Sequence, residues 1–531
     1  MPGLVVALVA SVAAMGLRAA EPAQARLLVN IVVDGLEGEY LDLLREHFGD
    51  GGFRRLERDG AVILNADYGT GLDAAASTAL LMTGASPSLN GIGSADSYDR
   101  ESLRVKDIYA DTDVLGNFTT QGYSPRALRV SNISDEARIA SGGTSVVYSV
   151  AATPTVAISL AGHAANSALW LDTKTGNWAS STYYKEMPTA IATRNRTQPL
   201  NMRMDTMSWV PSHDISTYPA LPDHLRRYPF RYVFPRSNTS RFEMFCASPL
   251  INREVNTVAS DLLSTLKVGQ HEGVTDVLNL SYTIAPYNYG RNPDARVELM
   301  DSYIKLDATL QQLFADIDRR VGLANTVVML AATPPRRQSR RDDEQWGIPF
   351  GEFSTRKAIS LLNIYLMAVY GNGDYVSAYH NRQFYLNHKL ISEKALDESE
   401  VREKAAAFLA RMTGIDRVHT IDEIIAGHAG EKPEVLRRNT VSSASGDIIV
   451  SVAPGYELVD DFNRMPSSER VPLAERSAAT TAPVFIMAPG IASQTIGEVV
   501  DARAIAPAVC RILRIRSPNG ASEAPVHLLK K

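Results

Sequence analysis

The sequence predicts an α/β fold, in which helices cover both faces of a mainly parallel sheet and a helix-rich cap is inserted late in the chain. Short apolar runs rich in β-branched residues recur along the chain, and segments with helical spacing separate them. Such runs are typical of strands buried on both faces, and their alternation with helices is typical of a parallel sheet. The clearest run, residues 27–33, is interrupted only by Asn30 and leads into Asp34. Ligands bind beyond the carboxyl ends of such strands, so Asp34 is a candidate metal ligand or catalytic carboxylate, or else a cap for the next helix.

The other elements follow from the same two patterns. Buried strands are predicted at residues 61–64, 144–150, 275–280, 326–331 and 484–487. Helices are predicted within residues 36–59, 73–82, 258–267 and 296–319, where apolar residues recur at helical spacing or alanine is frequent. A helix-rich and tyrosine-rich stretch, residues 348–428, predicts the inserted cap.

The 531 residues suit one large α/β domain with insertions, or two to three domains. An apolar run from Leu4 to Leu17, followed by small residues, predicts a signal peptide over residues 1–25, although its start lacks Lys or Arg and an uncleaved anchor is an alternative. We therefore expect an exported protein, periplasmic or secreted, with no membrane span in the mature chain. The predicted core covers residues 26–336 and 440–531, and the cap covers residues 337–439.

Composition excludes some classes of function. The net charge of -5 and the pI of about 6.1 argue against a nucleic-acid partner, because no surplus of positive charge is available to neutralise phosphates. Only two cysteines occur, Cys246 and Cys510, which excludes a disulfide-rich scaffold and a cysteine zinc site. The sequence does not decide whether the two cysteines pair.

Ten short motifs, spread over nearly the whole mature chain, resemble those of one family in the same order. They lie at residues 31–34, 51–56, 82–85, 90–92, 161–172, 180–184, 362–368, 384–389, 445–448 and 517–520. They include Ala-Gly-His at residues 161–163 and Asn-His-Lys at residues 387–389. The chain resembles the exported alkaline phosphatases of the nucleotide pyrophosphatase/phosphodiesterase type. The resemblance implies an alkaline-phosphatase-like fold.

The resemblance also implies a chemistry that this chain lacks. Such enzymes use two zinc ions about 4 Å apart, held by Asp and His side chains, and a metal-bound threonine as nucleophile. Alignment of the motifs puts Ala74 at the nucleophile position, and Asp34 is the sole match to a metal ligand. The degenerate ligand positions carry Thr78, Ala285, Thr333, Pro334 and Thr481, and the phosphate-contact positions carry Ala95, Thr153 and Thr155.

Replacement chemistry is conceivable but has little support in the sequence. Ser77, Thr78 or Thr83 could act as a nucleophile only beside a base or a metal. Asp34 and Asp73 could hold one hard cation, although magnesium and calcium prefer six or more oxygen ligands.

Two new features lie near the expected crevice. Four arginines, Arg336, Arg337, Arg340 and Arg341, could hold a phosphate or sulfate by bidentate hydrogen bonds, although the acidic residues 342–344 favour a solvated mixed-charge loop. Four aromatic residues could form either a recognition surface or a packed lid. They are Tyr287, Tyr289, Trp346 and Phe350.

The sequence therefore predicts a catalytically inactive, alkaline-phosphatase-like exported protein without a cofactor. It would bind an unknown exported or envelope protein, or an anionic ligand in the former active-site crevice. The alternative is a zinc-dependent phosphomonoesterase or phosphodiesterase with a rearranged site, so whether the chain is an enzyme stays open.

Overall fold

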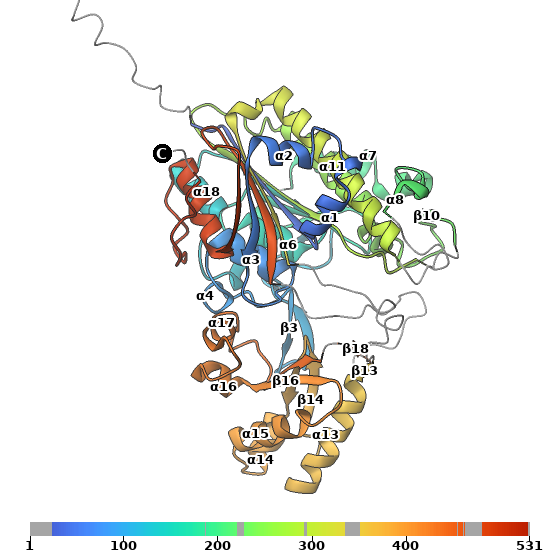
Figure 1. Cartoon of the computed structure of the whole chain (residues 1–531), viewed down its shortest axis with the longest axis vertical. Helices are drawn as coiled ribbons and strands as arrows, with labels where there is room; N and C mark the ends of the chain where they lie inside the picture. Colours follow the sequence, from blue (N-terminus) through green and yellow to red (C-terminus); the bar gives the residue numbers. More distant parts are fainter. Residues whose placement is uncertain are drawn as a thin grey trace, which may run out of the picture.

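A ten-stranded sheet forms the body of the molecule in the computed structural model (Figure 1). The structure describes residues 24–185, 187–219, 228–290, 295–334, 351–453, 455–459, 461 and 480–528. The strand order is β20-β2-β19-β12-β1-β11-β6-β7-β8-β5. The strands are β1 (Leu27–Asp34), β2 (Ala61–Asp67), β5 (Gly116–Asn117), β6 (Val147–Ala151), β7 (Ser167–Leu171), β8 (Trp178–Ser181), β11 (Asp276–Thr283), β12 (Thr326–Ala332), β19 (Thr481–Met487) and β20 (Gln494–Asp501).

The centre of this sheet is parallel, as predicted. β1 lies between β11 and β12 and is parallel to both, and β11 continues in parallel to β6 and β7. β19 runs antiparallel between β12 and β2, so the sheet is mixed but mainly parallel. Every residue of β1 before Asp34 is buried, which explains why all of them except Asn30 are apolar. Asn30 donates to the side-chain oxygen of Asn279 on β11 at 2.8 Å.

Helices cover both faces of the sheet, which confirms the predicted fold class (Figure 1). One face carries α3 (Ala74–Thr83), α5 (Ile133–Ala140), α6 (Pro154–Ala161) and α18 (Ile505–Leu513). The other carries α1 (Gly38–Leu43), α2 (Phe53–Asp59), α10 (Leu250–Thr265) and α11 (Arg296–Arg320). Shorter core helices are α4 (Pro87–Asn90), α7 (Thr189–Thr197), α8 (Leu200–Arg203) and α9 (Arg241–Cys246).

The helical pattern over residues 36–59 is broken into α1, a single 3-10 turn and α2. The break lies at residues 49–52, where the buried Asp307 carboxylate accepts hydrogen bonds from the backbone N–H groups of Gly49 and Phe53, both at 2.8 Å. This carboxylate caps the start of α2 from α11, 254 residues away. A β-carbon on Gly52 would lie 2.1 Å from Asp307 Oδ1, so glycine is required for the approach.

Gly52→Ala is therefore expected to destabilise the fold by about 1–3 kcal/mol, because the new methyl group must displace a buried carboxylate. Chemical denaturation measures the change. Gly497→Ala is the matched control, since a β-carbon added there would have no atom within 4 Å and its φ is not positive. Equal stability of the two variants would contradict the proposed role of Asp307.

The inserted part lies below the sheet in Figure 1 and has a sheet of its own. Its strand order is β14-β15-β17-β16, formed by β14 (Val376–His380), β15 (Gln383–Leu386), β17 (Ile448–Val452) and β16 (Ile415–Thr420). Its helices are α13 (Thr355–Tyr370), α14 (His388–Glu393), α15 (Glu398–Leu409), α16 (Ile421–Ala426) and α17 (Pro433–Arg438). β17 follows the expected boundary at residues 439/440, yet it pairs with β15 and β16 of the cap.

A hairpin of β3 (Asp96–Asp99) and β4 (Arg104–Asp107) connects the core to the cap. From this hairpin, Arg100 donates to the buried Asp447 carboxylate at 3.0 Å, and His380 Nε2 lies 2.8 Å from Asp96 Oδ1. His388 Nε2 lies 2.8 Å from Asp447 Oδ1, which unites two of the short motifs noted in the sequence. Burial opposes the charge of Asp447, but hydrogen bonds from His388 and from the Leu386 N–H and the Arg100 charge outweigh it and lower its pKa.

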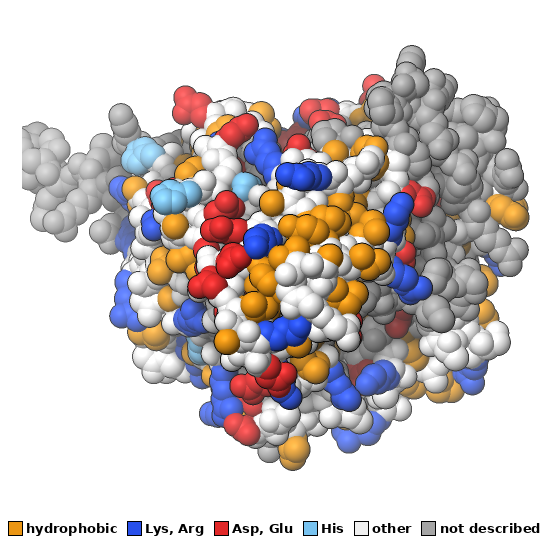
Figure 2. All heavy atoms as spheres, turned by 90° about the horizontal axis from the view of Figure 1, so that it is seen from below, with side chains coloured by type: hydrophobic (Ala, Val, Ile, Leu, Met, Phe, Trp, Pro, Cys, Tyr) orange, Lys and Arg blue, Asp and Glu red, His pale blue; other side chains and the backbone are white. Residues whose placement is uncertain are grey.

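The cap also exposes an apolar helix face. Leu361, Ile364 and Val369 of α13 are 38%, 59% and 41% exposed. Apolar side chains gather on the surface seen from the cap side, between basic and acidic groups (Figure 2). Nothing in the structure shows what would cover them.

The two cysteines are free and do not form a disulfide. Burial raises the pKa of both Cys246 and Cys510 to about 12. Neither thiol is therefore a thiolate nucleophile near neutral pH.

The predicted signal peptide lies outside the described residues, except for Gln24 and Ala25. Among the helices that the structure describes, none has the length and apolar character needed to cross a bilayer.

Candidate functional site

The candidate site lies at the carboxyl ends of β1 and β12. Asp34, the last residue of β1, accepts a hydrogen bond at 2.6 Å from the hydroxyl of Thr333, which directly follows β12. The same hydroxyl oxygen lies 3.3 Å from the Gly35 N–H and accepts from it. Thr333 is 1% exposed. A neutral hydroxyl thus occupies the position beside Asp34 at which the family resemblance implies a metal ligand.

The start of α3 lies at the same edge of the fold. Ala74, which the alignment of the motifs puts at the nucleophile position, is its first residue, and its methyl group offers no reactive atom. Asp73 caps the helix: its Oδ1 accepts from the Ala76 N–H at 2.9 Å, and its Oδ2 accepts from the Ala95 N–H at 2.6 Å. The two segments that carry the nucleophile and phosphate-contact positions are thus joined by one carboxylate.

The hydroxyl groups of α3 serve the helix itself. Thr78 and Thr83 are buried, and each hydroxyl donates at 2.6 Å to a helix carbonyl, of Ala74 and Ala79 respectively. Ser77 is also buried, with its hydroxyl 3.4 Å from the Leu72 carbonyl. No base contacts these hydroxyls among the described residues, so their geometry offers no activated nucleophile.

The other phosphate-contact positions carry no charge. Thr153 and Thr155 flank the start of α6, and their hydroxyl oxygens lie 3.4 Å apart. Thr153 is exposed and Thr155 is buried. Neither can supply the positive charge that the family resemblance implies for binding a phosphate.

Aromatic packing fills the region after β11, where the family resemblance implies further metal ligands. Ala285 is exposed, but Tyr287 is 3% exposed and packs against Trp209 and Tyr232, with ring centroids 5.2 and 4.6 Å away. Burial strongly raises the pKa of the Tyr287 hydroxyl. Tyr287 is therefore part of a packed lid and not of an exposed recognition surface.

The remaining candidate positions are dispersed or lie outside the described part of the chain. Pro334 is buried beside Thr333, and Thr481 begins β19 opposite Asp67 of β2. The arginines and two of the aromatic residues noted in the sequence lie outside the described residues. They are Arg336, Arg337, Arg340, Arg341, Trp346 and Phe350.

Comparisons with known proteins identify the family. Residues 28–471 match the family model of type I phosphodiesterase / nucleotide pyrophosphatase. The chain belongs to this family. It is 26% identical over 530 residues to alkaline phosphatase PafA of Elizabethkingia meningoseptica, covering 94% of each chain. It is 30% identical over 331 residues to alkaline phosphatase PhoV of Synechococcus elongatus, covering 58% of this chain and 59% of PhoV.

Structural comparison agrees with the family assignment. The crystal structure of wild-type PafA superposes with a TM-score of 0.83 at 25% sequence identity, covering 95% of this chain and 98% of PafA. Membership of the alkaline phosphatase superfamily and its fold, both expected from the short motifs, are confirmed.

The expectation that the chain has no cofactor is wrong. Its relatives are alkaline phosphatases, and the family therefore points to a metal cofactor, which the family resemblance gives as zinc. The described residues do not provide the complete set of ligands that two zinc ions require. Within the described ranges, no three His, Cys, Asp or Glu side chains lie together in a way that could hold a metal, and Asp34 faces a threonine hydroxyl.

The Ala-Gly-His motif of the family has a structural role here that sequence reasoning missed. His163 Nδ1 lies 3.1 Å from the buried Asp135 carboxylate, and its Nε2 lies 2.9 Å from the Leu128 carbonyl oxygen. The Asp135 carboxylate and the Leu128 carbonyl oxygen both receive a hydrogen bond from the ring only when both ring nitrogens carry a proton. The hydrogen bond with Asp135 raises the pKa of His163 although burial opposes the charge.

The fold is therefore expected to lose stability as pH rises from about 6 to 8. A raised pKa in the folded state stabilises the fold fully below the unfolded value of about 6.5, and this stabilisation is lost as pH rises through the folded pKa of His163. Unfolding midpoints of the wild type and of His163→Gln across this range test it. The variant is expected to show a flatter pH dependence, and parallel curves would contradict the assignment.

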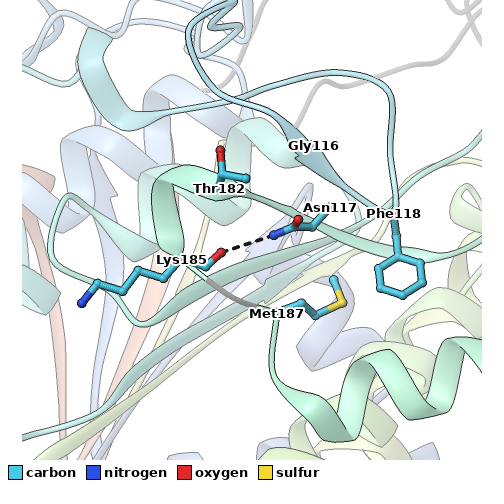
Figure 3. A pocket seen from close by; sticks show the side chains of 6 residues that line it. All are labelled: Gly116, Asn117, Phe118, Thr182, Lys185 and Met187. Carbon is cyan, nitrogen blue, oxygen red and sulfur yellow. Dashed lines mark hydrogen bonds between the residues drawn. The ribbon is translucent and has the colours of Figure 1, made fainter.

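A separate pocket lies at the far edge of the sheet (Figure 3). It has a volume of about 410 Å³ and is lined by Gly116, Asn117, Phe118, Thr182, Lys185 and Met187. Phe118 and Lys185 have φ angles of 62° and 64°. The Lys185 amine points away from the Phe118 ring in Figure 3. The pocket contains none of the candidate site residues.

Proposed function

We propose that this chain is an exported, catalytically inactive member of its phosphodiesterase family that acts by binding. The ligand would be a protein of the cell envelope or extracellular space, or an anion in the former active-site crevice. The observation that carries the proposal is Ala74 at the start of α3, because the nucleophile position holds a methyl group. A hydroxyl is essential to the family's covalent chemistry.

Three further observations support the loss of catalysis. The positions of phosphate contact are Ala95, Thr153 and Thr155, which cannot supply charged hydrogen bonds to a phosphoryl group. The Asp34 carboxylate is hydrogen-bonded to Thr333. The segment after β11 is packed by aromatic rings. A protein that keeps this fold but has lost its catalytic groups can still bind a ligand or a partner protein, because fold and catalytic function are separable.

The alternative is a metal-dependent phosphomonoesterase or phosphodiesterase with a rearranged site. The relatives of this chain support a phosphoric ester as the substrate class for this alternative, since PafA and PhoV are alkaline phosphatases. Nothing in the described geometry favours this alternative over inactivity. Hydrolysis assays on an aryl phosphate monoester and diester, with zinc present throughout, distinguish the two.

The proposal that the ligand is an anion is tested separately by replacing the four arginines between residues 336 and 341. A variant with alanine at positions 336, 337, 340 and 341 is expected to lose affinity for inorganic sulfate or phosphate, because bidentate hydrogen bonds from the guanidinium groups would be lost. Equilibrium dialysis with labelled phosphate measures it. Unchanged affinity would remove these arginines from the proposal and leave a protein partner.

A further inference from the structure

Backbone N–H groups near Ala74 and at Ala95 already donate hydrogen bonds to a carboxylate of the chain itself. Asp73 Oδ1 accepts from Ala76 N in the first turn of α3, and Asp73 Oδ2 accepts from Ala95 N, 22 residues further along the chain. Backbone N–H groups do not depend on side-chain identity. They therefore persist at positions where the side chains that would contact a phosphoryl group have been replaced.

This arrangement also has an electrostatic reason. Residues 75–83 of α3 are buried, and its first turn carries no acidic residue apart from the capping Asp73. The N–H groups at a helix start carry partial positive charge and favour a negative group. A carboxylate held by two backbone N–H groups forms charge-assisted hydrogen bonds, which are stronger than neutral ones.

We propose that the Asp73 carboxylate takes the place of a phosphoryl group between the start of α3 and the loop at Ala95. The inference rests on the proposed loss of catalysis at the same site. It means that an external anion does not reach these donors in the wild-type chain. Any anionic ligand would have to bind elsewhere.

The bridge also connects the crevice to the cap. Ala95 is followed directly by Asp96, the first residue of β3, whose carboxylate contacts His380 of the cap. Asp73 is thus a positioning residue that fixes the start of the core–cap hairpin. Asp397 provides a comparison, since it caps α15 of the cap by accepting from the Glu400 N–H at 2.9 Å.

The test compares Asp73→Ser with Asp397→Ser in thermal unfolding. Serine retains a helix cap but removes the carboxylate in each case. Inorganic phosphate, added at constant ionic strength against chloride, is expected to raise the Tm of Asp73→Ser by at least about 2 °C at about 50 mM, because the anion binds the folded state alone. The wild type and Asp397→Ser are expected to show no such phosphate-specific shift.

Two results would overturn the proposal: no phosphate-specific stabilisation of Asp73→Ser, or saturable phosphate stabilisation of the wild type that Asp73→Ser does not exceed. Asp73→Ala serves as a second variant, because its methyl group cannot accept from Ala95 N. Hydrogen exchange at the Ala95 amide is expected to be at least about tenfold faster in this variant, since a lost hydrogen bond lowers protection. Unchanged exchange would contradict the bridge. Phosphatase turnover by the wild type would refute the proposed function. The thermal-shift and hydrogen-exchange measurements would still decide the role of Asp73.

Discussion

The wild-type chain, assayed with zinc, is expected to hydrolyse an aryl phosphate monoester at least about 10⁴-fold more slowly than an active alkaline phosphatase of its family, because removal of a nucleophile alone costs this much or more in hydrolases. The nucleophile position is Ala74, and the neighbouring N–H donors are bound by Asp73. Initial rates with monoester and diester substrates, measured over a range of zinc concentrations, give the comparison.

Ala74→Thr is the informative companion variant. Restoring this hydroxyl is expected to leave the rate at the wild-type level, because a threonine without an adjacent base or metal is not activated. Purified PafA serves as the positive control under the same conditions. Turnover by the wild type within about 100-fold of PafA, a difference of about 2.7 kcal/mol in the barrier, would refute inactivity and favour a rearranged metal site.

Asp447→Ala is expected to lower the free energy of unfolding by about 2–4 kcal/mol, because it removes a buried carboxylate that accepts several hydrogen bonds, most of them from cationic side chains. The Asp447 side chain is 1% exposed. It accepts from Arg100 of the core hairpin at 3.0 Å and from Arg402 of α15 at 3.3 Å. It also accepts from the Leu386 N–H at 2.7 Å, so the loss reaches both the cap and its connection to the core.

Urea unfolding of the wild type and variant measures the loss. Asp416→Ala is the matched control, since Asp416 lies in the same cap sheet but is 45% exposed beside Arg417. Exposed ion pairs contribute about 0–1 kcal/mol, so the control is expected to stay close to the wild type. A similar small effect for Asp447→Ala would show that the network is not needed to hold the cap.

The sequence alone was sufficient for the elements whose burial is continuous. The runs that became β1 and β12 lie between other strands and beneath helices, which explains why most of their residues are apolar. The short motifs were sufficient for the family, and their alignment predicts Ala74 at the nucleophile position. Both kinds of signal depend on residue identity at fixed positions, which the sequence records directly.

The tertiary structure decided what depends on contacts between distant residues. Asp307 interrupts the first helical pattern from 254 residues away, and His388 contacts Asp447 from 59 residues away. The pairing of Asp73 with Ala95 is equally absent from any local pattern. Spacing and propensity report on one segment at a time, whereas a buried carboxylate takes its role from the donors that the fold brings to it.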